Sequence, residues 1–283
     1  MGAHRPRRGP PARGQGLISL TAHAAGPLIL AHDDEGSGPA VVLLHAGVAD
    51  RGMWSPVVPA LAAAHRVVTP DLRGFGESAL PGEAYADADD IANLLGALGI
   101  DRAAVVGASF GGRVAMEFAV RHPHRVESLV LVCPAYRGLE VTDPVVLAFG
   151  DREDELLEAG DVEGATALNV DLWVGPEATD AARAEVARMQ RRAFEVQLAA
   201  DALEPGPQPE RVEVDPRTIE TRTLVVSGAH DVAHHRDIAA LLGREIPGAE
   251  FIELDWAGHL PAVERPDETA DILLQAWASG ATP

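Results

Sequence analysis

The chain has 283 residues, 47% of them hydrophobic, which suits one large domain or a domain with an insertion. Its formal net charge is −20, and residues 1–16 carry four arginines and no acidic residue, so the rest is more acidic still. Such a surface repels nucleic acid and anionic membranes, and we expect neither as a partner. The chain has a single cysteine, Cys133, so it cannot form an internal disulfide. It also has no apolar run long enough to span a membrane. Both features favour a cytoplasmic protein.

The first segments of the chain predict a disordered tail over residues 1–16, then an antiparallel hairpin of Gly16–Ala24 and Pro27–His32, with a turn at residues 33–38. Short apolar runs typical of buried parallel strands follow, at Val41–Leu44, Arg66–Thr69, Ala103–Val106, Ser128–Val132, Thr223–Val226 and Glu250–Leu254. Helical patterns lie between them, at Ser55–Ala64, Asp87–Leu98, Gly111–His122, His235–Leu242 and Pro266–Ala278. This alternation predicts an α/β fold with a mostly parallel eight-stranded sheet flanked by helices.

The alternation stops between Pro134 and about Thr221. We therefore expect residues 135–221 to form a helical cap inserted into a core domain of residues 17–134 and 222–283. Within the insertion, the segment Thr179–Leu198 predicts a helix with one apolar face, formed by Val186, Met189, Ala193 and Val196. A mobile lid and a static covering layer are both consistent with this pattern.

The segment Gly107-Ala108-Ser109-Phe110-Gly111 joins an apolar run to a helical pattern. A G-x-S-x-G sequence between a strand and a helix is typical of a nucleophile elbow, in which the glycines permit a very tight turn. The serine hydroxyl is then held clear of the backbone at a helix N-terminus, where amides can bind developing negative charge. We interpret Ser109 as the nucleophile.

A serine hydroxyl needs a base to take its proton, and the base needs an orienting acid. Asp231 and His259 follow two later strand patterns, in the chain order serine, acid, histidine that this type of elbow requires. We predict that His259 is the base and that Asp231 holds its tautomer. Asp255 is the rival acid, and Asp71, which precedes the serine, is expected to be structural.

Two backbone amides must bind the oxyanion of a tetrahedral intermediate. One is expected from Phe110, directly after the nucleophile. The other is expected from the loop after Val41–Leu44, with the Gly47 amide favoured and the Val48 amide as the alternative. His45, at the end of that strand, is interpreted as a support for the loop rather than as a base.

A metal site is a further possibility, because His230 and His234 have the i, i+4 spacing of a helical zinc site. His230, however, lies in a loop after a strand, where helical spacing does not apply. We therefore expect no metal and no cofactor.

Four motifs in this order resemble those of the α/β-hydrolase superfamily. Beyond the elbow they are Leu44-His45-Ala46-Gly47, the segment Asp71-Leu72-Arg73-Gly74-Phe75-Gly76-Glu77-Ser78, and Gly258-His259-Leu260-Pro261 with Glu264-Arg265-Pro266. The chain has His45-Ala46 where the family usually has His-Gly, which leaves open which amide completes the oxyanion hole. A serine nucleophile disfavours the dehalogenase and epoxide hydrolase branches. The loop after His45 is similar to that of small-molecule esterases and enol-lactone hydrolases.

These features predict a cofactor-free hydrolase of a small carboxylic ester or lactone that works through an acyl-serine, as a monomer or homodimer. Carbon–carbon bond hydrolysis, perhydrolysis and a cyclase or lyase reaction with the same triad are alternatives, as is a non-catalytic small-molecule binder. Arg137 is considered as a partner for a substrate carboxylate, although simple exposure is the alternative. Candidate pocket residues are Val48, Trp54, Tyr136, Trp173, Met189 and Phe194.

Overall fold

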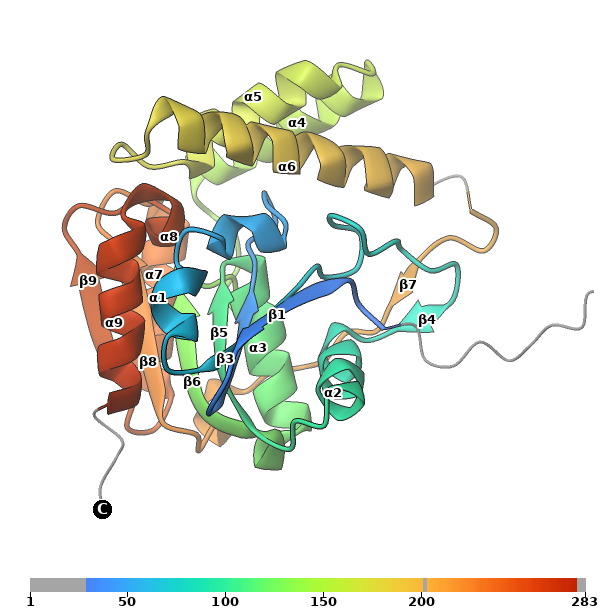
Figure 1. The fold of residues 1–283 in the computed structure, drawn as a ribbon. Coiled ribbons are helices and arrows are strands. Elements are labelled where there is room, and N and C mark those ends of the chain that lie inside the picture. Colours follow the sequence, from blue (N-terminus) through green and yellow to red (C-terminus); the bar gives the residue numbers. More distant parts are fainter. Residues whose placement is uncertain (1–28, 201–202, 279–283) are drawn as a thin grey trace, which may run out of the picture.

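The computed structural model describes residues 29–200 and 203–278 (Figure 1). Its strands are β1 (His32–Gly36), β2 (Ala40–Leu44), β3 (Arg66–Pro70), β4 (Ala84–Tyr85), β5 (Ala103–Ala108), β6 (Val126–Val132), β7 (Gln208–Pro209), β8 (Thr223–Gly228) and β9 (Glu250–Leu254). Its α-helices are α1 (Val58–Ala62), α2 (Asp87–Ala97), α3 (Phe110–Arg121), α4 (Pro144–Glu158), α5 (Val162–Trp173), α6 (Asp180–Ala200), α7 (Ala233–Glu245), α8 (Pro261–Glu264) and α9 (Pro266–Ala278). The expected tail and the expected strand Gly16–Ala24 lie outside the described residues.

The main sheet has seven strands in the described residues, in the order β1-β3-β2-β5-β6-β8-β9. β1 is antiparallel to β3, and the remaining neighbours are parallel. The six strands that the apolar runs predict are therefore confirmed. The eighth strand of the prediction is the one that lies outside the described residues.

The first described strand differs from the prediction. The sequence placed a strand at Pro27–His32 and a turn at residues 33–38, whereas β1 occupies His32–Gly36. These polar residues form a strand because each pairs with a residue of β3, from His32 opposite Pro70 to Gly36 opposite Arg66. Edge pairing satisfies the backbone of β1 without apolar side chains, so the hydrophobic pattern does not reveal it.

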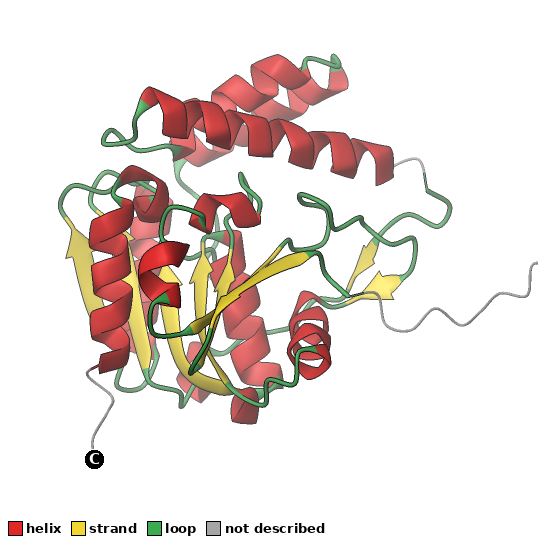
Figure 2. Ribbon diagram, in the orientation of Figure 1, coloured by secondary structure: helices red, strands yellow, loops and turns green. Residues whose placement is uncertain are grey.

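Helices cover both faces of the sheet (Figure 2). Alternate strand residues supply two separate cores. One core contains Val42, Leu44 and Val105 with apolar residues of α2, α3 and α7. The other contains Val41, Leu43 and Val106 with residues of α1 and α9.

Helices α4, α5 and α6 follow β6 in the chain and lie together beyond one end of the sheet (Figure 1). The helix expected near Thr179–Leu198 is α6, and Val186, Met189 and Ala193 are on its buried face. Within the described residues no helix combines the length and the apolar character needed to cross a membrane. The division into a core domain and a cap with the boundaries given above stays a prediction.

Candidate active site

Ser109 occupies a strained turn between β5 and α3. Its φ of 50° lies in the left-handed region that side chains other than glycine rarely adopt. The flanking glycines leave no room for a side chain, because a Cβ on Gly107 would lie 2.2 Å from the Gly111 carbonyl oxygen. A Cβ on Gly111 would lie 2.4 Å from the Leu44 carbonyl oxygen. Close backbone packing therefore forms the elbow that the G-x-S-x-G pattern predicts.

The two amides expected to form the oxyanion hole lie on adjacent segments. Phe110 is the first residue of α3, so its amide has no acceptor within the helix. In the loop after β2, the Ala49 amide donates to the Ala46 carbonyl at 3.1 Å, a turn that does not use the Gly47 amide. A Cβ on Gly47 would lie 3.5 Å from the Phe110 Cβ, so this loop passes directly beside the start of α3.

His45 ties this loop to the segment after β3. The Leu72 amide donates to His45 Nε2 at 2.9 Å, and His45 Nδ1 donates to the Ala46 carbonyl at 2.8 Å. Burial lowers the pKa of His45, so the ring is neutral and serves as acceptor and donor at once. These two bonds give His45 the supporting role that the sequence suggested.

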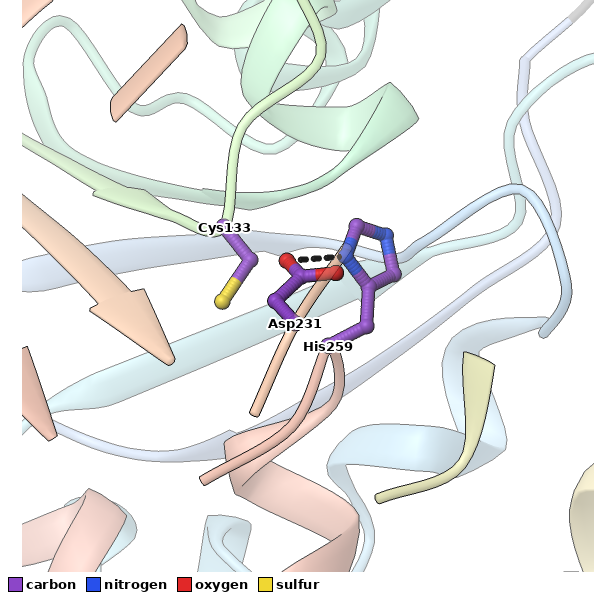
Figure 3. Close-up of side chains that lie close together, drawn as sticks. All are labelled: Cys133, Asp231 and His259. Carbon is purple, nitrogen blue, oxygen red and sulfur yellow. Dashed lines mark hydrogen bonds and ion pairs between the residues drawn. The ribbon is translucent and has the colours of Figure 1, made fainter. Parts of the chain in front are cut away.

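Asp231 and His259 come together at the carboxyl ends of β8 and β9 (Figure 3). His259 Nδ1 donates to Asp231 Oδ2 at 2.7 Å, and the two side chains are only 3% and 2% exposed. Burial alone would raise the pKa of Asp231, but the His259 ring beside it outweighs burial and lowers that pKa. Because Nδ1 of His259 bonds Asp231, Nε2 is the ring nitrogen that can act as a base.

Two further rings pack against His259. The centroid of Trp173, the last residue of α5, lies 4.7 Å from that of His259, and the centroid of His235 on α7 lies 4.4 Å from it. His235 Nδ1 donates to the Pro134 carbonyl at 3.1 Å. Burial, with His259 close by, lowers the pKa of His235 to about 3, which keeps this ring neutral beside the acid–base pair.

The segment from Val132 to Ala135 connects the serine with the acid–base pair. The Ser109 amide donates to the Val132 carbonyl at 3.0 Å, and the Ala135 amide donates to the Ser109 carbonyl at 2.9 Å. On its other side, Cys133 Sγ donates to the Gly258 carbonyl at 3.6 Å. Sequence reasoning missed this connection, because only a buried strand end marks it.

The described residues contain one group of side chains that could bind a metal ion: Cys133, Asp231 and His259 (Figure 3). Their donor atoms lie within 4.8 Å of one another. Asp231 and His259 already bind each other, and burial raises the pKa of the Cys133 thiol, which favours the protonated form. This chemistry suits a hydrogen-bonded pair better than a metal centre. This group does not include His230 and His234, the two histidines whose spacing suggested a zinc site.

The candidate pocket residues separate into different environments. Trp173 contacts His259 directly, whereas Trp54 is fully buried within the core on the α1 and α9 face. The Tyr136 hydroxyl donates to the Val214 carbonyl at 3.1 Å and so binds the segment that returns to β8. Val48 is almost buried in the same core as Trp54.

The remaining candidate side chains, Met189, Phe194 and Arg137, also have defined surroundings. Met189 and Phe194 are buried on α6, with Phe194 packed against Leu156 and Ala165 of the neighbouring helices. Arg137 pairs with Glu117 at 3.3 Å.

The two other acidic candidates do not replace Asp231. Asp255 is exposed, and the His259 ring bonds Asp231 instead. Asp71 is buried and accepts the Arg51 amide at 2.9 Å and the Glu77 amide at 2.8 Å, as a structural acid does.

Comparison with known proteins places this architecture in a family. A family model described as the α/β hydrolase fold matches residues 39–266, which is most of the chain. The chain therefore belongs to the α/β-hydrolase fold family. The mostly parallel sheet flanked by helices agrees with that assignment.

The individual similar proteins are named for different activities. The chain is 38% identical over 124 residues to a 2-hydroxy-6-oxo-2,4-heptadienoate hydrolase of Pseudomonas putida. This match covers 41% of this chain and 45% of the hydrolase, which is less than half of each protein. It is 28% identical over 250 residues to the pimeloyl-(acyl-carrier protein) methyl ester esterase of Aeromonas hydrophila, covering 84% of this chain and 95% of the esterase. The enol-lactonase from Burkholderia xenovorans LB400 superimposes with a TM-score of 0.70 at 25% identity, covering 88% of this chain and 96% of that one.

Proposed function

We propose that the protein is a cofactor-free serine hydrolase that cleaves a small carboxylic ester or lactone through an acyl-serine. The observation that carries the proposal is the buried 2.7 Å bond between His259 and Asp231, at the same sheet edge as the strained Ser109 elbow. An esterase and an enol-lactonase among the similar proteins, each matched over most of the chain, support this substrate class.

The proposed reaction assigns one role to each group. Ser109 Oγ attacks the carbonyl carbon while His259 Nε2 takes its proton, and Asp231 stabilises the imidazolium through Nδ1. The Gly47 and Phe110 amides bind the oxyanion. When the C–O bond breaks, His259 returns the proton to the leaving oxygen. Water then attacks the acyl-serine with His259 as base, which releases the acid and restores Ser109.

In the described residues the Ser109 hydroxyl has no hydrogen-bond partner. Catalytic hydrogen bonds are often long or poorly aligned before substrate binds, so this arrangement is compatible with the proposed roles. We also propose that α4, α5 and α6 cap the site, since Trp173 of α5 packs on the His259 ring.

The direct test is a panel of short acyl esters and lactones, turned over by the wild type and by Ser109→Ala. We expect turnover in the wild type and a kcat lower by about 10⁴-fold or more in the variant, because the nucleophile is lost. A fluorophosphonate probe should label Ser109 in the wild type. An inactive, unlabelled wild type would refute the triad and favour a non-catalytic binder.

A second candidate is hydrolysis of a carbon–carbon bond in a diketone-type substrate with the same triad. It is favoured by the 38% identity to the heptadienoate hydrolase, although that match spans only 41% of this chain. A wild type that labels at Ser109, leaves the ester and lactone panel intact and cleaves a 2-hydroxy-6-oxo-dienoate into two products would support this candidate.

A further inference from the structure

Glu264, the last residue of α8, is a buried carboxylate surrounded by backbone amides. The residue is 5% exposed, and the Gly258 amide donates to both of its carboxylate oxygens at 3.0 Å. The amides of Leu260 and Glu177 also face the carboxylate and oppose the rise in its pKa that burial causes. Among the described residues no cationic side chain pairs with Glu264. The neighbouring Arg265 pairs with the Glu177 carboxylate at 3.0 Å instead.

The three donating amides come from two separate segments. Gly258 and Leu260 flank His259 in the loop after β9, whereas Glu177 lies in the connection between α5 and α6. The segments meet backbone to backbone, since a Cβ on Gly258 would lie 2.6 Å from the Gly175 Cα. A Cβ on Gly175 would lie 2.0 Å from Glu264 Oε2, so a side chain at this position would displace the carboxylate.

The same connection reaches His259 a second time. Trp173, two residues before Gly175, places its ring 4.7 Å from the His259 ring. The backbone on both sides of His259 is thus bonded to Glu264, and its ring is packed by the segment that Glu264 also holds.

We infer that Glu264 is a positioning residue for His259, which fastens the histidine loop and the segment Trp173–Glu177 into one unit. The inference rests on the proposed function, because it assigns His259 the role of the base. A carboxylate suits this place since it only accepts hydrogen bonds, and three amide donors converge on it. A glutamine would turn an NH₂ group toward those donors and could not satisfy all of them.

Two variants approach the carboxylate from opposite sides. Glu264→Gln keeps the size of the side chain and removes its second acceptor oxygen. Gly175→Ala leaves Glu264 and His259 unchanged but pushes a methyl group against Oε2. The matched controls are Glu268→Gln, which loses only an exposed ion pair with Arg265, and Gly150→Ala on α4, where an added Cβ meets nothing within 4 Å.

The experiment measures kcat and KM on an ester that the wild type hydrolyses, together with the rate of fluorophosphonate labelling of Ser109. Circular dichroism and thermal unfolding establish that each variant is folded. We expect both test variants to lower kcat and the labelling rate by roughly 10- to 100-fold, with KM within about 3-fold, because a small displacement of a base slows proton transfer. Both controls should match the wild type. The low-field resonance of the His259 Nδ1 proton should shift or broaden in the test variants only.

Each other outcome has a distinct meaning. Folded test variants with wild-type kcat, or with a change in KM alone, would overturn the inference. If one variant does not fold, the other decides. Failure of both to fold would also overturn it, because Glu264 would then hold the domain together rather than place the histidine. A wild type that is neither active nor labelled would instead contradict the proposed function.

Discussion

The serine half and the acid–base half of the site are built in different ways. Ser109 is held by backbone groups, through the close approach of Gly107 to Gly111 within the turn and through backbone contacts with Leu44 and Val132 on the neighbouring strands. His259 is held by the side chains of Asp231 and Trp173, which are distant in the chain, and by the nearby Glu264, which binds the amides around it. The proposed nucleophile therefore depends on close backbone packing, and the proposed base depends on polar and aromatic side-chain contacts.

This difference implies different responses to mutation. A change in the serine half should act first on folding, because it forces backbone atoms apart. A change in the acid–base half should act first on catalysis or on pH dependence, because the groups there are charged, buried or both. Three variants test this contrast.

The largest effect is expected from Asp231→Asn. The variant keeps the shape of the side chain and loses the charge that stabilises the imidazolium, so kcat should fall by about 10⁴-fold while the protein stays folded. Steady-state kinetics and circular dichroism check both parts. Asp255→Asn is the matched control and should retain wild-type kcat. If the control loses activity and Asp231→Asn does not, Asp255 is the acid.

Gly107→Ala should act on the serine half through stability. The new methyl group would lie 2.2 Å from the Gly111 carbonyl oxygen, so we expect a loss of about 3 kcal/mol or more in the free energy of unfolding. Urea denaturation measures this loss. Gly96→Ala is the control within α2, where nothing lies within 4 Å of an added Cβ, and it should be neutral or stabilising by up to about 1 kcal/mol. Equal stabilities for the two variants would show that the elbow tolerates a side chain.

His235→Asn should change the pH dependence of stability. The pKa of His235 is about 3 in the folded protein against 6.5 for an ordinary histidine, so below pH 6.5 the unfolded chain binds a proton that the folded one does not. Folding stability should therefore fall as the pH drops, by about 2 kcal/mol between pH 7 and pH 5 from this residue alone.

Urea denaturation at pH 7 and pH 5 measures that dependence in the wild type and in the variant. The difference between the two pH values should be smaller in His235→Asn by about 2 kcal/mol, because asparagine does not titrate. The same difference in both proteins would mean that His235 is protonated in the folded state or is not buried.

Much of the fold could be predicted from the sequence, because the signal was local. Six apolar runs identified β2, β3, β5, β6, β8 and β9. The sequence did not reveal the short strands β4 and β7, which pair with each other, or β1, whose polar residues form a strand only because β3 pairs with them. A hydrophobic pattern cannot reveal an element that is stabilised by backbone pairing at a sheet edge.

The candidate site divides in the same way. Ser109, Asp231 and His259 could be singled out because each follows a strand pattern in a recognisable motif. The contacts of Trp173 and His235 with the His259 ring could not, since an aromatic or histidine side chain in a helix gives no sign of its distant neighbour. Trp54 and Tyr136 were equally plausible pocket residues in the sequence, but one is fully buried and the other bonds Val214.

By itself, the sequence determined the alternation of strands and helices, the position of the glycine-flanked turn at Ser109 and the chain order of the proposed nucleophile, acid and base. These features depend on the periodicity and the steric demands of neighbouring residues, which act over a few positions. Only the tertiary structure decided that Asp231 rather than Asp255 bonds His259, and that Glu264 gathers amides from two loops. Such choices depend on distances between segments far apart in the chain, which are set when the sheet and the α4–α6 layer pack together.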